Sequence, residues 1–187
     1  MKLKIKLYSL LIISIIVCSC SSDDEETNNN TFDNRITVGS NTYELTNAYL
    51  ELSELGNSAF YSIILTKGEI DYSTSPETYA NEFELATVWS VRVPLTDTFL
   101  NSTTYNFDQD ANSVRHLSAF GFSNEYQIVN NEIQSFNSVF NQNDIVDENA
   151  RIIINELPNG SYNINFNAIT TIGQVNGEFT GNLIHAN

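Results

Sequence analysis

Strict alternation of apolar and polar residues is clearest near the C-terminus. Apolar side chains at 162, 164, 166 and 168 alternate with asparagines, and residues 175–183 repeat the pattern. A period of two is typical of a strand with one face on a core. With the apolar run 152–154 and the turn 158–160, these segments predict an antiparallel meander. Gly177 and Gly181 fall on its inward positions, where glycine lets a bulky neighbour cross closely or lets the strand curl.

The rest of the chain shows further strand signals. Residues 35–38, a Gly-Ser-Asn turn and the run from Thr42 predict a hairpin. Residues 59–67 are apolar on both faces, and residues 84–93 alternate so that Trp89 lies on an apolar face and is expected in the core. Ser75-Pro76-Glu77 favours a short helix over 76–81, because it offers an N-cap, proline at N1 and an acid in the first turn.

About eight to ten strands and almost no helical periodicity predict an all-β fold. An antiparallel β-sandwich and a calycin-like β-barrel both fit this pattern. The prediction is a single domain over residues 34–187, with at most one short helix.

The N-terminus has the layout of a secretory signal. Lys2, Lys4 and Lys6 precede the apolar run 7–17, which is shorter than the roughly 20 residues that a membrane-spanning helix needs. Val17-Cys18-Ser19-Cys20 resembles a bacterial lipobox, and the resemblance implies a signal peptide over 1–19 and a diacylglycerol on Cys20. Two acyl chains suffice for stable membrane anchoring. The alternative is an ordinary signal peptide that contains cysteines.

An acidic segment follows the candidate anchor. Residues 20–33 are polar and predict a flexible tether. Its start resembles the export signal that takes lipoproteins of the Bacteroidetes to the cell surface, and the resemblance rests on Ser22, Asp23, Asp24, Glu25 and Glu26. It implies an outer-membrane protein exposed at the surface. A plain solvated tether at the periplasmic face is the alternative.

Several segments of the domain resemble a group of uncharacterised β-rich lipoproteins of Bacteroidetes. They are ITVGSNTYELTNAYLEL at 36–52, YSIILT at 61–66, LNSTTYNF at 100–107, GSYNINFNA at 160–168 and VNGEFTGNL at 175–183. Asn101-Ser102-Thr103 departs from the group, in which a glycine is expected. The resemblance implies a β fold and a membrane location, and it implies no chemistry for any residue.

Charge and cysteine content exclude several kinds of function. Removal of residues 1–19 takes three of eight basic residues and none of 23 acidic ones, which changes the formal charge from −15 to −18. The remaining basic residues are scattered, so nucleic acid binding, which needs a clustered basic face, is excluded. Cys18 and Cys20 are the only cysteines, which leaves no internal disulfide and no thiolate metal site in the domain.

Catalytic candidates are few. There is no G-x-S-x-G motif, and the two histidines are His116, expected at a surface or an edge, and His185, expected to fray. A carboxylate pair could hydrolyse glycosides, but no pocket is indicated around any pair. We therefore expect a protein that is not an enzyme.

Calcium is the best metal candidate. Asp108, Asp110 and Asn112 place oxygen ligands at alternating positions, as an EF-hand loop does, but Ser113 and Ala119 replace its glycine and its glutamate. A solvated hairpin loop is the alternative, because Asp and Asn favour turns. The acidic group in residues 144–148 has the same two interpretations. No other cofactor is indicated.

The asparagines at 163, 165 and 167, with those at 176 and 182, would present amides on one sheet face. Amides recognise sugars, although a solvent face is the simpler interpretation. The leading hypothesis is a non-enzymatic β-domain, anchored at the surface, that binds or presents a glycan or a small apolar molecule. The alternative is a structural or accessory subunit of an outer-membrane envelope complex.

Overall fold

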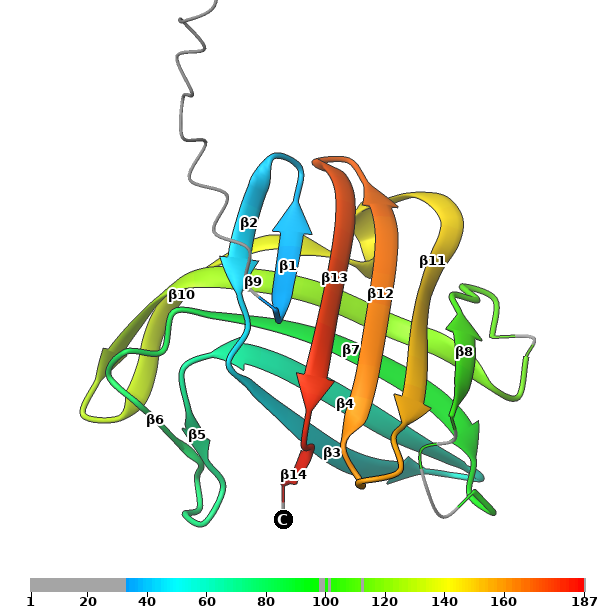
Figure 1. The fold of residues 1–187 in the computed structure, drawn as a ribbon, viewed down its shortest axis with the longest axis horizontal. Helices are drawn as coiled ribbons and strands as arrows, with labels where there is room; N and C mark the ends of the chain where they lie inside the picture. Colours follow the sequence, from blue (N-terminus) through cyan, green and yellow to red (C-terminus); the bar gives the residue numbers. More distant parts are fainter. Residues whose placement is uncertain (1–32, 98–99, 101, 112, 187) are drawn as a thin grey trace, which may run out of the picture. The chain divides into compact units, whose positions relative to one another are not determined.

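Two six-stranded sheets pack against each other in the computed structural model, which describes residues 33–97, 100, 102–111 and 113–186 (Figure 1). Sheet 1 has the order β2 (Asn41–Glu44), β1 (Arg35–Val38), β13 (Gly173–Gly181), β12 (Tyr162–Thr170), β11 (Ile145–Glu156), β8 (Thr103–Asn106). Sheet 2 has the order β10 (Glu132–Asn141), β9 (His116–Val129), β7 (Leu85–Pro94), β4 (Ser58–Lys67), β3 (Asn47–Leu55), β14 (Ile184–His185). A small third sheet pairs β5 (Ile70–Asp71) with β6 (Thr78–Tyr79).

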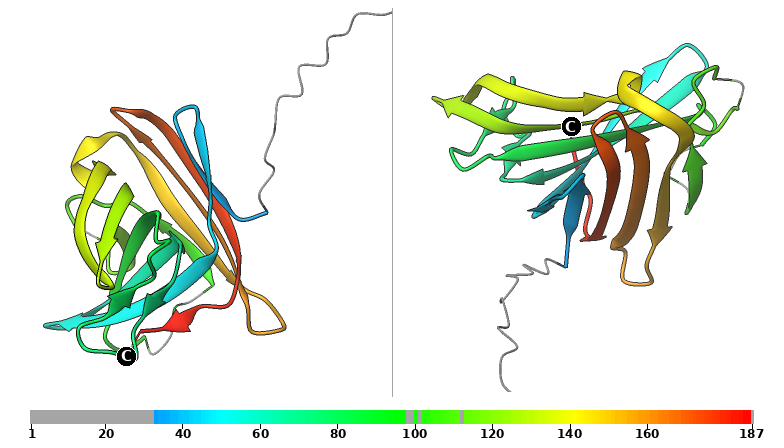
Figure 2. Two further views of the ribbon diagram at one scale, coloured as in Figure 1. Left: turned by 90° about the vertical axis from the view of Figure 1, so that its left-hand side faces the viewer. Right: turned by 90° about the horizontal axis from the view of Figure 1, so that it is seen from above.

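The fold is an all-β sandwich. Each large sheet keeps two edges, which are β2 and β8 in sheet 1 and β10 and β14 in sheet 2, so the strands do not close into a calycin-like barrel. The strands of sheet 2 run across those of sheet 1, as Figures 1 and 2 show. The 3₁₀ turn η1 (Gln142–Asp144) carries the chain from β10 in sheet 2 to β11 in sheet 1.

The predicted hairpin and meander are confirmed. β1 and β2 pair with Arg35 opposite Glu44, and Gly39 in their turn has a φ of 61°, which glycine adopts without strain. β11, β12 and β13 are consecutive antiparallel neighbours. Their apolar positions face sheet 2, since residues 152, 154, 164, 166, 168, 175 and 179 are all buried.

Trp89 lies at the centre of the core, as its alternating pattern predicted. It is fully buried, and its ring stacks on Phe120 of β9 with the ring centroids 4.9 Å apart and packs at a tilt against Phe166 of β12, with centroids 4.6 Å apart. Its indole Nε1–H donates to Thr87 Oγ1 at 2.9 Å, and the Thr87 hydroxyl donates to the Gly121 carbonyl. The only tryptophan therefore joins both sheets and still has its polar atom satisfied.

Gly177 is required where β13 crosses the Phe166 side chain. The two residues are direct partners in the β12–β13 pair, so both point into the core. A Cβ on Gly177 would overlap the Phe166 ring and lie 2.8 Å from the Arg35 carbonyl oxygen. The close crossing expected from the inward glycine is confirmed at this position.

The segment between β4 and β7 folds over the outer face of sheet 2. It buries a second, smaller cluster of Tyr49, Ile64, Ile70, Phe83 and Ala86. This cluster explains why β4 is apolar on both faces, since Ile63 enters the main core and Ile64 enters the outer one.

The helix predicted over 76–81 is wrong. Thr78 and Tyr79 form β6, and the Ser75–Pro76 peptide bond is cis. The backbone N–H of Tyr79 donates to the Asn131 carbonyl and that of Ala80 to the Glu69 carbonyl. Both backbone N–H groups therefore bond to other segments of the chain. A helix of six residues without an apolar face is too short to be stable by itself, so it does not form in place of these bonds.

Candidate functional site

The outer face of sheet 1 is an ordered polar surface. Residues that alternate with the core positions point away from sheet 2, and the strand register aligns them in two rows that cross all six strands. One row is Glu44, Arg35, Glu178, Asn165, Ile153 and Thr104. The other is Thr42, Thr37, Asn176, Asn167, Arg151 and Asn106. Neighbours in a row lie one strand spacing apart, roughly 4.8 Å.

Hydrogen bonds and one ion pair hold these side chains in place. Arg35 Nη2 lies 2.7 Å from Glu178 Oε1, and Arg151 Nε donates to Asn167 Oδ1 at 2.9 Å. Asn165 Nδ2 donates to Asn163 Oδ1 at 2.8 Å along β12. Each amide has two donors and two acceptor lone pairs, so these bonds orient the amides and leave hydrogen-bonding capacity that faces solvent.

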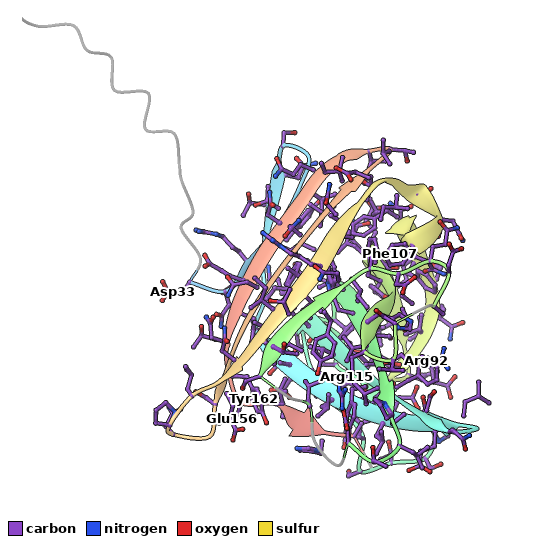
Figure 3. All side chains as sticks on the ribbon, turned by 90° about the vertical axis from the view of Figure 1, so that its right-hand side faces the viewer. Asp33, Arg92, Phe107, Arg115, Glu156 and Tyr162 are labelled. Carbon is purple, nitrogen blue, oxygen red and sulfur yellow. The ribbon has the colours of Figure 1, made fainter. Side chains whose placement is uncertain are left out.

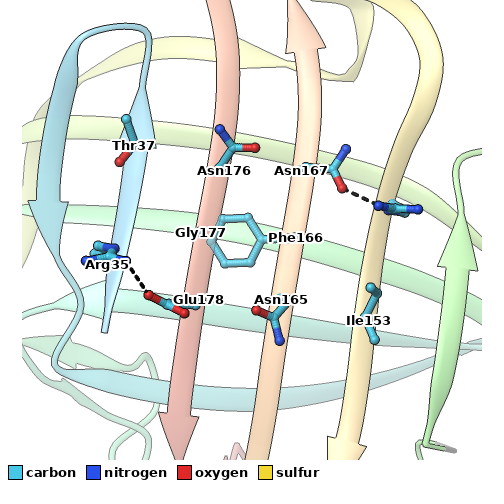
Figure 4. Close-up of a pocket in the computed structure, with 10 residues that line it drawn as sticks. Arg35, Thr37, Ile153, Asn165, Phe166, Asn167, Asn176, Gly177 and Glu178 are labelled. Carbon is cyan, nitrogen blue, oxygen red and sulfur yellow. Dashed lines mark hydrogen bonds and ion pairs between the residues drawn. The ribbon is translucent and has the colours of Figure 1, made fainter. Parts of the chain in front are cut away.

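A shallow depression of about 340 Å³ lies between the two rows (Figure 4). Phe166 and Gly177 form its floor, because both turn inward and raise no side chain above the sheet. Arg35 on β1 and Arg151 on β11 line its two sides, with the asparagines of β12 and β13 between them. The depression therefore offers amides, hydroxyls and a guanidinium to a ligand that lies across the strands.

Arg151 is the cation best placed for a ligand. It is exposed, and no described carboxylate lies within ion-pair distance of its guanidinium. Its Nε donates to Asn167 Oδ1, and this bond restrains the plane of the exposed guanidinium group. A fixed guanidinium can bind a carboxylate or a pair of hydroxyl oxygens with two parallel hydrogen bonds.

The outer side of sheet 2 carries larger depressions with a different lining. One of about 590 Å³ has Glu82, Glu125 and Tyr126 in its wall, and one of about 400 Å³ is lined by residues that include Tyr72 and His185. Both depressions also have apolar and aromatic residues in their walls. The Tyr72 hydroxyl donates to Glu51 at 2.8 Å, and burial and then this bond raise the pKa of Tyr72. We therefore take the face of sheet 1 as the better candidate site.

In the loop that the sequence offered as a calcium site, Asp108 stabilises the turn. The carboxylate of Asp108 accepts the backbone N–H of Ser113 at 2.7 Å, and the Ala111 N–H donates to the Asp108 carbonyl at 3.2 Å. Arg115, which Figure 3 labels, lines the same depression as Asp108 and Asp110. Asn112 lies outside the described residues. Within the described ranges, no group of three or more His, Cys, Asp or Glu side chains could hold a metal ion.

The expectations for the histidines are wrong. His116 is 2% exposed, and its Nδ1 lies 2.6 Å from the Ser113 carbonyl, so it anchors the loop before β9 from within the protein. His185 does not fray, because it pairs with Leu50 in β14, and the Ala186 N–H donates to the Leu50 carbonyl. The sheet edge left open by β3 holds the chain end in place.

Among the carboxyl groups, Asp71 shows a lowered pKa, caused by hydrogen bonds from the side chain and the backbone of Ser73. A general acid of a glycosidase needs a raised pKa, so the shift of Asp71 is opposite to that requirement.

The predicted amide face is present, and the sequence reasoning missed part of it. Asn163, Asn165, Asn167 and Asn176 share the outer face as expected. Arg35 and Arg151 were not linked to them, although each occupies the outward parity of its own strand. The alternation within each strand showed that both arginines point outward. It could not show that they share a face with the asparagines until the strands had been paired.

Several predictions fall outside the described residues: the signal peptide predicted over 1–19, the candidate anchor Cys20, and the candidate export residues Ser22, Asp23, Asp24, Glu25 and Glu26. No helix in the described ranges is long and apolar enough to span a membrane. Comparison with known protein families, with curated proteins and with solved structures gave no match.

Proposed function

We propose that this chain is a surface-anchored lipoprotein whose β-sandwich binds a glycan on the outer face of sheet 1. The observation that carries the proposal is the pair of polar rows around the depression between Arg35 and Arg151. Sugars offer hydroxyls at short, regular intervals, and two rows of oriented amides and hydroxyls complement them. The open shape suits a chain that lies across several strands.

The closed core weighs against a small apolar ligand. Such a ligand binds in a cavity that covers most of its surface. The centre of this sandwich is filled instead by the Trp89 ring, which packs directly against Phe120 and Phe166. The depressions on the outer side of sheet 2 have aromatic and apolar residues in their walls, but they are open to solvent and would leave much of such a ligand exposed.

The test is binding of the detergent-solubilised lipidated protein to insoluble starch, xylan, chitin and polygalacturonate. Replacing Asn165 and Asn167 together by alanine removes two or more hydrogen bonds of about 0.5–1.5 kcal/mol each. We expect at least about fivefold weaker retention on whichever polysaccharide binds. The matched control replaces Asn57 and Gln127, two exposed amides outside this face, and should leave retention unchanged. Equal retention of both double variants would refute the site.

The anchor has a separate test. Cys20→Ala should release the protein from the membrane fraction, because no acyl chains would remain to hold it. Protease treatment of intact cells should remove the domain from wild-type cells if it faces outward. Survival of the domain while another surface protein is digested would place it on the periplasmic side.

A structural or accessory subunit of an envelope complex is the second candidate function. The packed centre around Trp89 favours it, since a domain filled in this way meets its partners through its surface. The Asn165→Ala/Asn167→Ala variant distinguishes the two candidates. It should weaken glycan binding, whereas contact with a protein partner elsewhere on the domain does not depend on these two side chains.

A further inference from the structure

The depression on sheet 1 is locally positive in a domain that is otherwise strongly acidic. From Asp33 onward the chain has 19 acidic residues and only five lysines and arginines. Two of these five, Arg35 and Arg151, line the depression, and Glu178 is the only acid among the described residues of its wall. In each of the three other depressions described above, acids outnumber basic residues among the described lining. The face proposed to bind a glycan therefore differs in charge from those depressions.

Arg151 supplies the net positive charge. Arg35 is neutralised by Glu178, whose Oε1 lies 2.7 Å from Arg35 Nη2 (Figure 4). Arg151 is exposed, and no described carboxylate lies within ion-pair distance of its guanidinium. A guanidinium has five N–H donors, and the only one of Arg151 that bonds to a described residue is the Nε–H, which donates to Asn167 Oδ1. The four N–H donors of its two Nη groups remain for a ligand.

The row of outward residues that contains Arg151 carries no acid. Apart from Arg151 it consists of amides and hydroxyls, from Thr42 on β2 to Asn106 on β8. Glu44 and Glu178, the acids of the two rows, both lie in the other row. A ligand that lies along the row of Arg151 therefore meets one cation at β11 and neutral hydrogen-bonding groups on either side of it.

We infer that the glycan bound on this face is acidic, and that the carboxylate of one of its sugar residues binds the Nη groups of Arg151. The inference rests on the proposed function, because it names the class of glycan for the same face. A guanidinium binds a planar carboxylate through two parallel hydrogen bonds, and a restrained guanidinium plane favours this geometry. Arg35 is three strand spacings away, roughly 14 Å, so the same carboxylate cannot contact both arginines. The hydroxyls of the neighbouring sugar residues then lie over Asn167 and Asn176.

Two acids near Arg151 leave this contact open. Glu178 is two strands away and is paired with Arg35. Asp147 lies four residues before Arg151 on β11, outside the depression, and its Oδ1 accepts hydrogen bonds from the backbone and the side chain of Asn149. At physiological ionic strength, exposed charges more than about 8 Å apart are largely screened from each other. The acidity of the whole domain is therefore largely screened at the site, and the groups around Arg151 decide which ligand binds.

Retention on polygalacturonate and on the same polymer with methyl-esterified carboxyl groups tests the inference. The two polymers share their sugar backbone and hydroxyls and differ in the charge of the carboxyl group. The detergent-solubilised protein is passed at physiological ionic strength over each polymer coupled to the same resin. Retention should be at least about fivefold weaker on the ester, because the hydrogen bonds to a charged group are lost. Arg151→Gln should weaken retention on polygalacturonate by a similar factor and change retention on the ester much less.

Arg92→Gln is the matched control. Arg92 lies on β7 in the other sheet, its Nε–H donates to Ser58 Oγ at 2.9 Å, and no described carboxylate is within ion-pair distance of it. The variant removes the same charge from a different face, so it should be retained on polygalacturonate as well as the wild-type protein. Equal weakening by Arg92→Gln and Arg151→Gln would show an effect of net charge alone and overturn the inference.

The remaining outcomes distinguish this inference from glycan binding itself. Equal retention on polygalacturonate and its ester, or retention on starch or xylan alone, would overturn the acidic class, while weaker retention of Asn165→Ala/Asn167→Ala would still support a glycan site on this face. If no polysaccharide retains the protein, or if that double variant is retained as well as wild type, the proposed function fails and the inference fails with it. Polyglutamate has carboxylates without sugar hydroxyls and should be retained more weakly than polygalacturonate. Equal retention on polyglutamate would indicate an acidic peptide as the ligand and overturn the inference.

Discussion

Replacing Gly177 by alanine tests whether the crossing of β13 over Phe166 is packed as tightly as described. The added methyl group meets the Phe166 ring on one side and the Arg35 carbonyl oxygen, 2.8 Å away, on the other. The ring cannot move aside easily, since Phe166 is 3% exposed and lies 4.6 Å from the ring of Trp89. The overlap can therefore be removed only if the core or the β1–β13 pair shifts.

The expected loss follows from two opposing effects. Overpacking a well-filled core costs about 1–3 kcal/mol. Gly177 does not occupy the left-handed region, so alanine recovers about 0.5–1 kcal/mol of the entropy that glycine loses on folding. Because backbone as well as side chain is in the way, we take the upper part of the overpacking range. The net loss is then about 2 kcal/mol, which lowers the melting temperature by about 4–8 °C in a domain of this size.

Thermal and urea unfolding of Gly177→Ala, Phe166→Leu and the double variant measure this effect. Removing the ring should make the alanine tolerable, so the double variant should be at least about 1 kcal/mol more stable than the sum of the single losses predicts. Gly56→Ala is the control, because its φ of 61° disfavours alanine while nothing lies near the added atom. Its loss should not change with Phe166→Leu. A Gly177→Ala protein as stable as wild type would refute the steric explanation.

Three further outcomes follow from the described contacts. Thr87→Val removes the acceptor of the buried Trp89 Nε1–H and should cost about 1–3 kcal/mol in urea unfolding, and unchanged stability would contradict the hydrogen bond. Burial and then nearby Glu77 raise the pKa of Tyr79 to about 12, so absorbance titration should show a tyrosine that ionises well above pH 10. The folded state holds the Tyr79 proton more tightly than the unfolded chain does. The stability that this adds is therefore complete below about pH 10 and is lost as the pH rises towards 12. A Tyr79→Phe protein with the same alkaline unfolding curve as wild type would contradict this effect. Calcium should leave the melting temperature unchanged, because no group of three ligating side chains gathers around Asp108 and Asp110 within the described residues, and a rise that Asp110→Ala removes would contradict this.

Strands with one buried face were predictable because the alternation of side chains is local. The pattern around Trp89 identified β7 and its inward face, and the pattern from 162 to 183 identified β12, β13 and the inward glycine at 177. The turn at Gly39 fixed the first hairpin for the same reason. These features depend on neighbours within a few residues, and the sequence contains that information directly.

The features that were missed depend on distant pairing. His185 is held by β3, which lies more than a hundred residues earlier, and the segment 76–81 is drawn into β-structure by Glu69 and Asn131. Arg35 joins the polar rows only because β1 pairs with β13. Propensity at positions 75–77 favoured a helix, but tertiary hydrogen bonds outweighed it.

The polar face proposed to bind a glycan depends on the same distant pairing. The rows of sheet 1 require six strands in one register, so a slip of one residue would turn Asn165 and Asn167 into the core. Asn165→Ala/Asn167→Ala removes two side chains and leaves that register unchanged. The double variant should therefore weaken retention on polysaccharide while the domain stays folded.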